Sequence, residues 1–182
     1  MIKWWKLGLQ VTLTFGHKNI IFLTRRPFSS IYEMDKTLIE NWNNRVGKND
    51  FVIFLGDFAY RNDKSVFNYM DRLHGHITFI QGNHDAQLGS NTVQSLILNI
   101  EEEGNIYCVH DPKDFSSAYN INLVGHVHQN WKIKKFYQTT LINVGVDVWN
   151  FAPVNFDEIL EMKETFEKEW SKKWKRKYHK LR

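Results

Sequence analysis

Apolar and polar positions in the first half of the chain follow two different periods, which indicates strands separated by helices. Residues 7–15 form an apolar, β-branched stretch that predicts a strand. Residues 51–55 form a continuous apolar run before Gly-Asp, which is typical of a strand buried on both faces. Between them, apolar residues recur at helical spacing over residues 31–46. Ser30 and Glu33 fit a helix-capping box at its start, so we predict a helix there.

The second half carries short apolar runs in close succession, which favours a region rich in strands. A second helix is predicted over residues 64–73. Strands are predicted over residues 77–80, 96–100, 106–110, 121–124, 131–136 and 139–144. Strands and helices therefore alternate first, and strands dominate afterwards. This order predicts a mixed α/β domain with packed sheets over residues 1–154.

The last segment of the chain has the pattern of a long charged helix over residues 157–182, and residues 155–182 form a predicted extension of the domain. Acidic side chains concentrate in its first half and basic ones in its second, which suits the helix dipole. Apolar residues recur every four positions, at Met162, Phe166, Trp170, Trp174 and Tyr178. Such a stripe predicts packing against the domain or against a second copy in a homodimer. The alternative is a basic, aromatic tail for nucleic acid or a membrane surface.

Composition narrows the class of protein. The chain has 182 residues, 42% of them hydrophobic, which is enough for one domain core. It contains no apolar run of about 18 residues, so no membrane span is expected. No secretory signal is recognised, and we expect a cytoplasmic location. The single cysteine, Cys108, excludes an intramolecular disulfide and a multi-cysteine zinc site. A net charge of +4 permits a polyanionic partner without requiring one.

Side chains able to bind metal recur where the predicted strands end. They are Asp57, Asn83, His84, Asp85, His110, His126 and His128. Any one of them alone could be a structural residue of a turn or strand. Sites in α/β proteins commonly lie at strand ends, however, so the ordered set predicts one site. A mixed set of oxygen and nitrogen ligands suits Mn, Fe, Zn, Co or Ni.

These motifs resemble those of the calcineurin-like metallophosphoesterases, in particular the short bacterial and phage-type members. The resemblance covers most of the chain and rests on residues 15–20, 26–28, 41–43, 55–58, 82–85, 124–128 and 143–149. It implies two packed β-sheets flanked by helices, with a two-metal site at the edge of the sheets. It also implies hydrolysis of a phosphomonoester or phosphodiester by a metal-activated hydroxide. The substrate class extends to nucleotides and nucleic acids.

The resemblance also implies a metal-binding role for five residues. Asp57 would bridge two divalent ions. Asn83, His110 and His126 would complete one site, and His128 would belong to the other. Manganese is the expected ion, with Fe, Zn, Ni, Co or Mg as alternatives and with one or two ions bound.

Four further residues are expected to act on the substrate or on a catalytic group. The resemblance implies that His84 stabilises or protonates the leaving oxygen and that Asp85 orients His84. His17 and Arg26 lie on predicted loops near the mouth of the site, and we expect them to bind the substrate. For His17 the alternative is a replacement metal ligand, and for Arg26 it is a solvated surface charge.

The chain departs from the family at its first motif. Thr12 and Thr14 stand where the family has Asp and His, and both are expected on one face of the first strand. The first metal would then keep only Asp57 and His128. Three interpretations follow: a weakened enzyme, a pseudo-phosphoesterase that binds a phosphorylated ligand or a protein, or a native N-terminal sequence that differs from this one. Asp147, in a further family-like stretch, is expected to order a loop.

Overall fold

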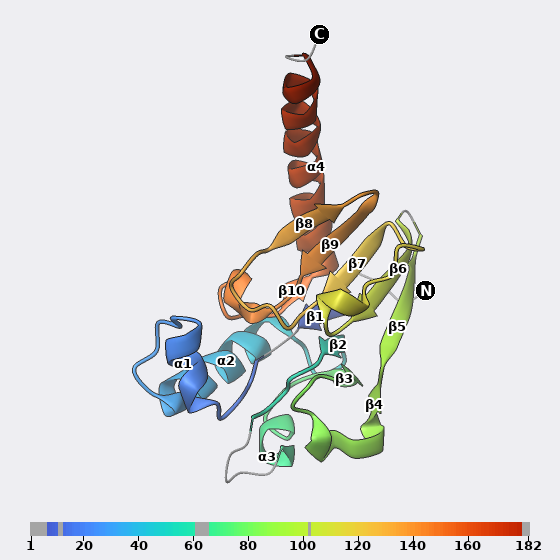
Figure 1. Cartoon of the computed structure of the whole chain (residues 1–182). Helices are drawn as coiled ribbons and strands as arrows, with labels where there is room; N and C mark the ends of the chain where they lie inside the picture. Colours follow the sequence, from blue (N-terminus) through green and yellow to red (C-terminus); the bar gives the residue numbers. More distant parts are fainter. Residues whose placement is uncertain (1–6, 11–12, 61–65, 102, 180–182) are drawn as a thin grey trace.

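A computed structural model of the chain describes residues 7–10, 13–60, 66–101 and 103–179. Two five-stranded sheets pack together, helices cover the outer face of one of them, and a long helix projects from the body (Figure 1). This arrangement confirms the predicted α/β fold of two packed sheets flanked by helices with a C-terminal helical extension. Within the described residues, no helix is both long and apolar enough to cross a membrane.

The first sheet carries two of the loops that build the site. Its strands, in spatial order, are β10 (Val154–Asn155), β1 (Leu7–Gln10), β2 (Phe51–Leu55), β3 (His76–Ile80) and β4 (Thr92–Val93). Strands β1 to β4 are parallel, and β10 pairs antiparallel with β1. Because parallel strands end at the same edge, the loops that follow β2 and β3 lie next to each other.

The second sheet supplies the other two loops of the site. Its strands, in spatial order, are β5 (Ser95–Ile100), β6 (Gly104–Val109), β7 (Ile121–Val124), β9 (Thr139–Asn143) and β8 (Ile133–Phe136). Strands β6, β7 and β9 are parallel, whereas β5 and β8 pair antiparallel at the two edges. The ends of β6 and β7 therefore also lie side by side.

Helices cover the first sheet on the side away from the second. They are α1 (Lys18–Leu23), α2 (Ile31–Arg45) and α3 (Phe67–Met70), and short 3₁₀ helices occupy Ala86–Asn91, Pro112–Asp114 and Val146–Val148. The predicted cap of α2 is confirmed, because the Ser30 hydroxyl accepts a hydrogen bond of 3.2 Å from the Glu33 amide. The Glu33 carboxylate accepts in turn from the Ser29 amide at 2.8 Å, one residue before the expected partner.

Strand β2 divides the hydrophobic core into two layers. Val52 and Phe54 pack against the helices, together with the fully buried Trp42 of α2. Ile53 and Leu55 point the other way, into the layer between the two sheets. Successive side chains of a strand point to opposite faces, and both faces of β2 are covered. This explains why the sequence of β2 is a continuous apolar run. It also fixes the position of the loop that begins at residue 56.

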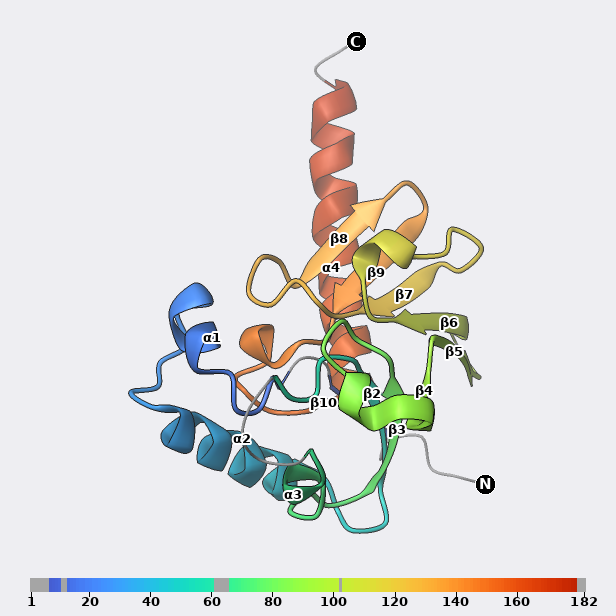
Figure 2. The same cartoon turned by 60° about the horizontal axis from the view of Figure 1, so that its bottom comes forward.

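The projecting helix α4 (Phe156–His179) is attached to the body by its first turns (Figures 1 and 2). Phe156 and Ile159 are buried in the layer between the sheets. Arg45 of α2 forms an ion pair with Glu158 at 2.8 Å. Further along, Trp170 stacks on Phe166 and is 40% exposed, since α4 has by then left the body.

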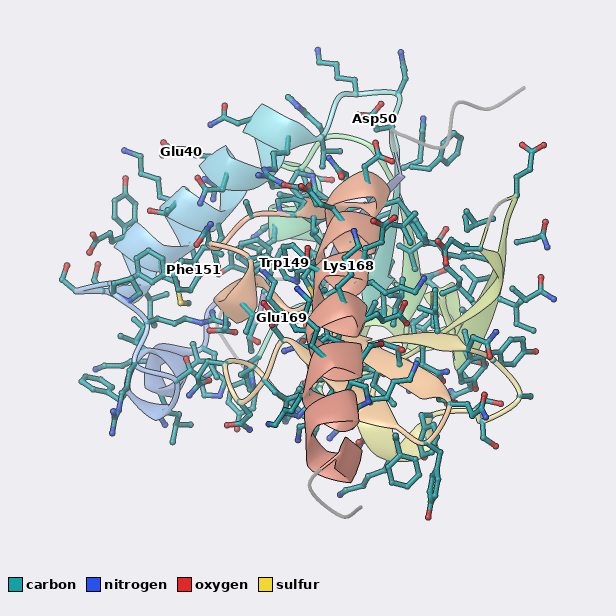
Figure 3. The ribbon with its side chains drawn as sticks, turned by 90° about the horizontal axis from the view of Figure 1, so that it is seen from above. Glu40, Asp50, Trp149, Phe151, Lys168 and Glu169 are labelled. Carbon is teal, nitrogen blue, oxygen red and sulfur yellow. The ribbon has the colours of Figure 1, made fainter. Side chains whose placement is uncertain are left out.

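The segment between the second sheet and α4 fills the space beside α2. In Figure 3 the label of Trp149 lies beside the ribbon of α4, and that of Phe151 lies farther from it, toward α2. The Asn41 side chain of α2 donates a hydrogen bond of 3.0 Å to the carbonyl of Phe151, and Arg45 donates one of 2.9 Å to the carbonyl of Pro153. Strand β10, which leads into α4, pairs antiparallel with β1, and the division of the chain at residue 155 stays a prediction.

Three predicted elements differ from the structure near the N-terminus. The strand predicted over residues 7–15 ends at Gln10, and after the undescribed residues 11–12 the chain is irregular. The segment that we expected to be a loop contains α1, whose cap is His17 rather than a usual capping residue. The helix predicted over residues 64–73 is reduced to the four residues of α3, and its predicted start lies outside the described residues.

Candidate metal and phosphoester site

Three side chains converge where β2, β6 and β7 end. Asp57 follows β2, His110 directly follows β6, and His126 follows β7. The Oδ2 atom of Asp57 lies 3.3 Å from Nε2 of His110, and that nitrogen lies 3.1 Å from Nδ1 of His126. One possible ligand atom from each residue lies within 4.8 Å of the other two. The structure thus brings together three of the five residues expected to bind metal.

Two glycines permit this close approach. Gly56 has a φ of 89°, and a Cβ atom there would lie 2.4 Å from Nδ1 of His110. A Cβ atom at Gly82 would lie 2.2 Å from the backbone nitrogen of Asp57. Residues with a Cβ atom rarely adopt the backbone conformation of Gly56. A Cβ atom at either glycine would displace a neighbouring residue of the site. The glycines of the two motifs are therefore required for the backbone to pass beside Asp57 and His110.

Asp57 and His110 form a buried pair with opposite pKa shifts. Burial alone would raise the pKa of Asp57 and lower that of His110, but their hydrogen bond and mutual attraction reverse both effects. The pKa of Asp57 is therefore lowered and that of His110 is raised. Nδ1 of His110 lies 2.7 Å from the carbonyl oxygen of Leu55, which can only accept a hydrogen bond. That nitrogen is thus the donor, and Nε2 faces Asp57 and His126.

His126 completes a donor set that fits a divalent cation. Burial lowers the pKa of His126, and the neighbouring His110 lowers it further, which favours a neutral imidazole. One carboxylate and two imidazole nitrogens are the ligands that transition metals such as manganese, iron or zinc accept. Asn83 directly follows Gly82 in the turn after β3, and its side chain is exposed. Asp57, His110 and His126 therefore fit one metal ion.

Asp85 holds the loops of the site together through backbone hydrogen bonds. Its Oδ2 accepts from the amides of Asp57 at 2.7 Å and Gly82 at 2.8 Å, and its Oδ1 accepts from the amide of Phe58 at 2.8 Å. Burial raises its pKa, and these hydrogen bonds oppose the rise. This differs from the expectation that Asp85 orients the ring of His84, because both carboxylate oxygens are occupied by backbone amides. Asp85 orders the turn that carries His84.

His84 lies at the exposed rim of the site in a row of aromatic rings. Its amide donates a hydrogen bond of 2.9 Å to Oδ1 of Asp57, and its side chain is exposed. Its ring meets the edge of Tyr60, with ring centroids 4.7 Å apart. Tyr60 stacks in turn on His17 at 3.9 Å. Burial lowers the pKa of His17, and the charges of His84, Arg26 and His128 lower it further, which places His17 among these groups.

His128 belongs to a second cluster next to the first. Its Nδ1 lies 3.2 Å from Oδ2 of Asp147. Burial alone would raise the pKa of Asp147, but the hydrogen bonds from His128 and Arg26 lower it. Arg26 binds both oxygens of Asp147, at 2.8 and 2.9 Å, and donates a third bond of 2.9 Å to the carbonyl of Leu13. The expected loop-ordering role of Asp147 is consistent with these contacts.

Arg26 does not occupy the place that we expected for a substrate-binding residue. Its side chain has no exposed surface, and its guanidinium is held by Asp147 and by the backbone of Leu13. Its hydrogen bonds to Leu13 and Asp147 link the segment after β1 to the segment after β9. It has no exposed face toward a substrate, so we correct the expectation of direct substrate binding for this residue.

Similarity to known proteins extends over most of the chain. The family profile of the calcineurin-like phosphoesterases matches residues 17–177. The chain belongs to this family. An uncharacterized protein of Methanocaldococcus jannaschii, MJ1445, is 37% identical to this phosphoesterase-family chain over 159 residues, which are 81% of the chain and 85% of that protein.

Solved structures are similar to this calcineurin-like chain at low sequence identity. AQ665 of Aquifex aeolicus, a protein of unknown function, has a TM-score of 0.68 and 19% identity, and the match covers 86% of this chain and 98% of that one. Vps29 of Chaetomium thermophilum has a TM-score of 0.49 and 9% identity, covering 83% and 75% of the two chains. The first of these matches shows that the fold of this chain occurs in a solved structure.

The first motif of the family is incomplete in this phosphoesterase-family chain. Thr12 lies outside the described residues. Thr14 has a φ of 51°, so the chain is not an extended strand there, which contradicts the expectation that Thr12 and Thr14 share a strand face. The buried Thr14 hydroxyl has no hydrogen-bond partner among the described residues, and it carries no charge. His128 contacts Asp147 through Nδ1, which leaves Nε2 for a metal ion, but the neutral Thr14 supplies no charged ligand to a second ion.

Sequence reasoning missed one residue of the site, Tyr60. It stands three positions after Asp57 in a segment where no spacing rule marks it, and its ring partners His17 and His84 lie far away in the sequence. Only the convergence of three loops makes its position significant. A weak signal existed, because an aromatic residue beside a phosphoesterase motif is a candidate for the rim of the site.

Proposed function

We propose that the chain is a metal-dependent phosphoesterase that hydrolyses a phosphomonoester or phosphodiester with one divalent ion in its site. The convergence of Asp57, His110 and His126 within 4.8 Å carries this proposal. Membership of the calcineurin-like phosphoesterase family supports the reaction class. Asn83 would add an amide oxygen to the ligand set.

Each residue of the site would have a defined part in the reaction. When bound, the ion supplies a Lewis acid that withdraws charge from the phosphoryl group and acidifies a water molecule. Asp57 would contribute the negative charge that holds the ion. His126 and His110, the latter after release of the proton from Nε2, would complete its ligands. His84, exposed at the rim, would present a ring N–H to the leaving oxygen and supply its proton. Asp85 would keep the turn of His84 in register with Asp57.

Manganese is the proposed ion, and Fe, Zn, Ni, Co or Mg are the alternatives that the same ligands could bind. We expect one equivalent of manganese per chain in equilibrium dialysis of protein first treated with a chelator. Two equivalents would contradict the incomplete first site. Replacing Thr12 with Asp and Thr14 with His should raise the number from one to two if that site has lost only these ligands.

The test of the proposed activity is turnover of bis(p-nitrophenyl) phosphate and p-nitrophenyl phosphate by folded, manganese-loaded protein. The Asp57→Asn variant should lose at least about 100-fold in turnover, because loss of a ligand exceeds the effect of loss of its supporting groups. The Asp157→Asn variant is the matched control, since that aspartate is exposed on α4, and it should retain full activity. Absence of turnover by the wild-type protein for both esters would contradict the proposal.

A pseudo-phosphoesterase is the second candidate, and it is favoured by the Thr14 hydroxyl at the first motif, which finds no partner in the part of the chain that the structure describes. In that case the site would bind a phosphorylated ligand or a protein without hydrolysis. Calorimetry with inorganic phosphate and manganese separates the two candidates. Saturable phosphate binding that requires manganese, without turnover of either ester, would favour the second.

The partners and location of the chain remain proposals. A nucleotide or nucleic acid is a candidate substrate, and a cytoplasmic location stays a prediction. For α4 we propose self-association into a homodimer. Residues 157–167 hold five acidic side chains and one Lys, whereas residues 168–182 hold one acidic side chain and eight Lys or Arg. Two such helices packed antiparallel would place opposite charges together and cover the exposed Trp170.

A further inference from the structure

We infer that Tyr60 is a positioning residue that holds the ring of His84 at the leaving-group side of the site, and that His17 anchors Tyr60. The inference rests on the proposed function, because it concerns the proton donor of that reaction. It assigns His17 a supporting role in place of the expected contact with substrate.

The row of rings starts from a fixed point, His17. Nδ1 of His17 accepts a hydrogen bond of 3.2 Å from the amide of Ile20, which makes His17 the cap of α1. Its own amide donates to the carbonyl of Thr14 at 3.4 Å. The orientation of the imidazole is therefore set by the start of a helix, independently of any ligand. Its ring lies nearly parallel to that of Tyr60, with an angle of 21° between the planes and 3.9 Å between the centroids.

Tyr60 is fixed from a second direction by its backbone. Its amide donates a hydrogen bond of 3.0 Å to the carbonyl of Phe15, and the preceding residue, Ala59, forms a parallel bridge with Phe15. The Tyr60 ring is half-buried, and it cannot follow a movement of His84 without losing its stacking contact with His17. It meets the His84 ring edge to face, at 81° and 4.7 Å, which lies within the range of about 4.5–7 Å that aromatic pairs prefer.

His84 needs such a support because no carboxylate among the described residues holds its ring. The side chain is exposed, and the hydrogen bond that it makes to Asp57 comes from its backbone amide. The adjacent Asp85 is occupied by three backbone amides. Within the described part of the chain, Tyr60 is the aromatic neighbour of the His84 ring. An exposed imidazole without this neighbour would sample several rotamers, and most of them would not reach the leaving oxygen.

Leaving-group dependence gives the sharpest kinetic test of this role. A phenyl phosphodiester has a poor leaving group that needs a proton, whereas p-nitrophenolate leaves without one. General acid catalysis contributes about 10²–10⁴-fold, so partial loss of positioning in Tyr60→Leu should lower kcat for the phenyl ester by about 10-fold or more. For the p-nitrophenyl ester, kcat should change by less than about 2-fold, and KM should be preserved for both.

Three companion variants define the effect. Tyr60→Phe keeps the ring and should behave like the wild-type protein, while His84→Ala should show the same leaving-group pattern more strongly. Tyr32→Leu is the matched control, because Tyr32 is an exposed tyrosine on α2 with no ring contact to His17, Tyr60 or His84, and it should change kcat for neither substrate. An equal loss on both esters in Tyr60→Leu would overturn the inference, since it would indicate a general structural effect.

A second measurement does not depend on activity. The ring of Tyr60 should shift the NMR signals of the His84 ring protons in metal-free protein, with His84→Ala providing the assignment. Tyr60→Leu should remove this shift, and Tyr32→Leu should leave it unchanged. If Tyr60→Leu leaves the signals in place, the rings do not touch and the inference fails. If the shift is lost but the wild-type protein hydrolyses neither ester, the contact holds and only the proposed function fails.

Discussion

Replacing Arg26 with Met should destabilise the fold more than any other single change of a polar residue outside the metal cluster. The side chains of Arg26 and Asp147 are 0% and 2% exposed, and two hydrogen bonds of 2.8 and 2.9 Å join them. Removing one partner of a buried pair leaves the other charge without compensation and costs about 3–5 kcal/mol. For a chain of this size, that cost corresponds to a fall in Tm of about 6–20 °C.

The assay is urea unfolding followed by circular dichroism, in chelator so that metal binding does not add to stability. Lys36→Met is the matched control, because Lys36 pairs with Glu40 at 3.8 Å on the exposed surface of α2. That change should cost less than about 1 kcal/mol. The double variant Arg26→Met with Asp147→Leu should recover part of the loss, since it leaves no unpaired carboxylate.

The pH dependence has a definite sign. In the wild-type protein the pKa of Asp147 is lowered, so its contribution to stability is present above the ordinary pKa of an aspartate, about 4, and is lost as the pH falls through the lowered value. Without Arg26, burial is less opposed and the pKa of Asp147 should rise. Protonation of Asp147 would then remove the uncompensated charge in the variant. The difference in unfolding free energy between the variant and the wild-type protein should therefore narrow as the pH falls toward 4. A loss below about 1 kcal/mol at neutral pH, or a gap that widens in acid, would contradict the role assigned to this ion pair.

Other predictions concern the metal site, the core and the projecting helix. Gly82→Ala should abolish manganese binding in calorimetry, because the added Cβ atom would collide with the backbone of Asp57. Gly47→Ala is the control and should retain binding. Tight manganese binding by Gly82→Ala would contradict the assigned geometry. Burial raises the pKa of the Cys108 thiol well above its usual range, so a thiol reagent should modify it only in denaturant, and rapid labelling of native protein would disagree with the core. Trp170→Glu should convert the proposed homodimer to a monomer in light scattering after size-exclusion chromatography, and a wild-type monomer would exclude the dimer.

The site was predictable where its chemistry coincides with local patterning. Asp57, His110 and His126 each follow an apolar run, and the resemblance to a phosphoesterase family joins them in one ordered ligand set on sequence alone. The regular strands β2 and β7 were predictable for the same reason, since they are short and apolar, and all their residues except Phe51 are buried. Local pattern and tertiary role agree at these positions, as they do in most well-ordered parts of a fold.

Residues whose role depends on distant partners could not be predicted in the same way. Arg26 reads as a surface charge because its partner, Asp147, is 121 positions away in the sequence. Asp85 reads as the partner of its neighbour, His84, whereas its hydrogen bonds go to backbone amides on two loops. The left-handed conformation of Thr14 is equally invisible, since threonine in an apolar stretch favours an extended strand.

The antiparallel pairing of β10 with β1 has a consequence for how the chain folds during synthesis. Gly8 and Leu9 pair with Asn155 and Val154, which leave the ribosome only after all the other strands of both sheets. Until then the outer edge of β1 presents unpaired backbone groups, although its inner edge can already pair with β2. The nascent domain therefore keeps this sheet edge open until residues 154–155 have been synthesised, and a chaperone that binds extended segments would find its site there.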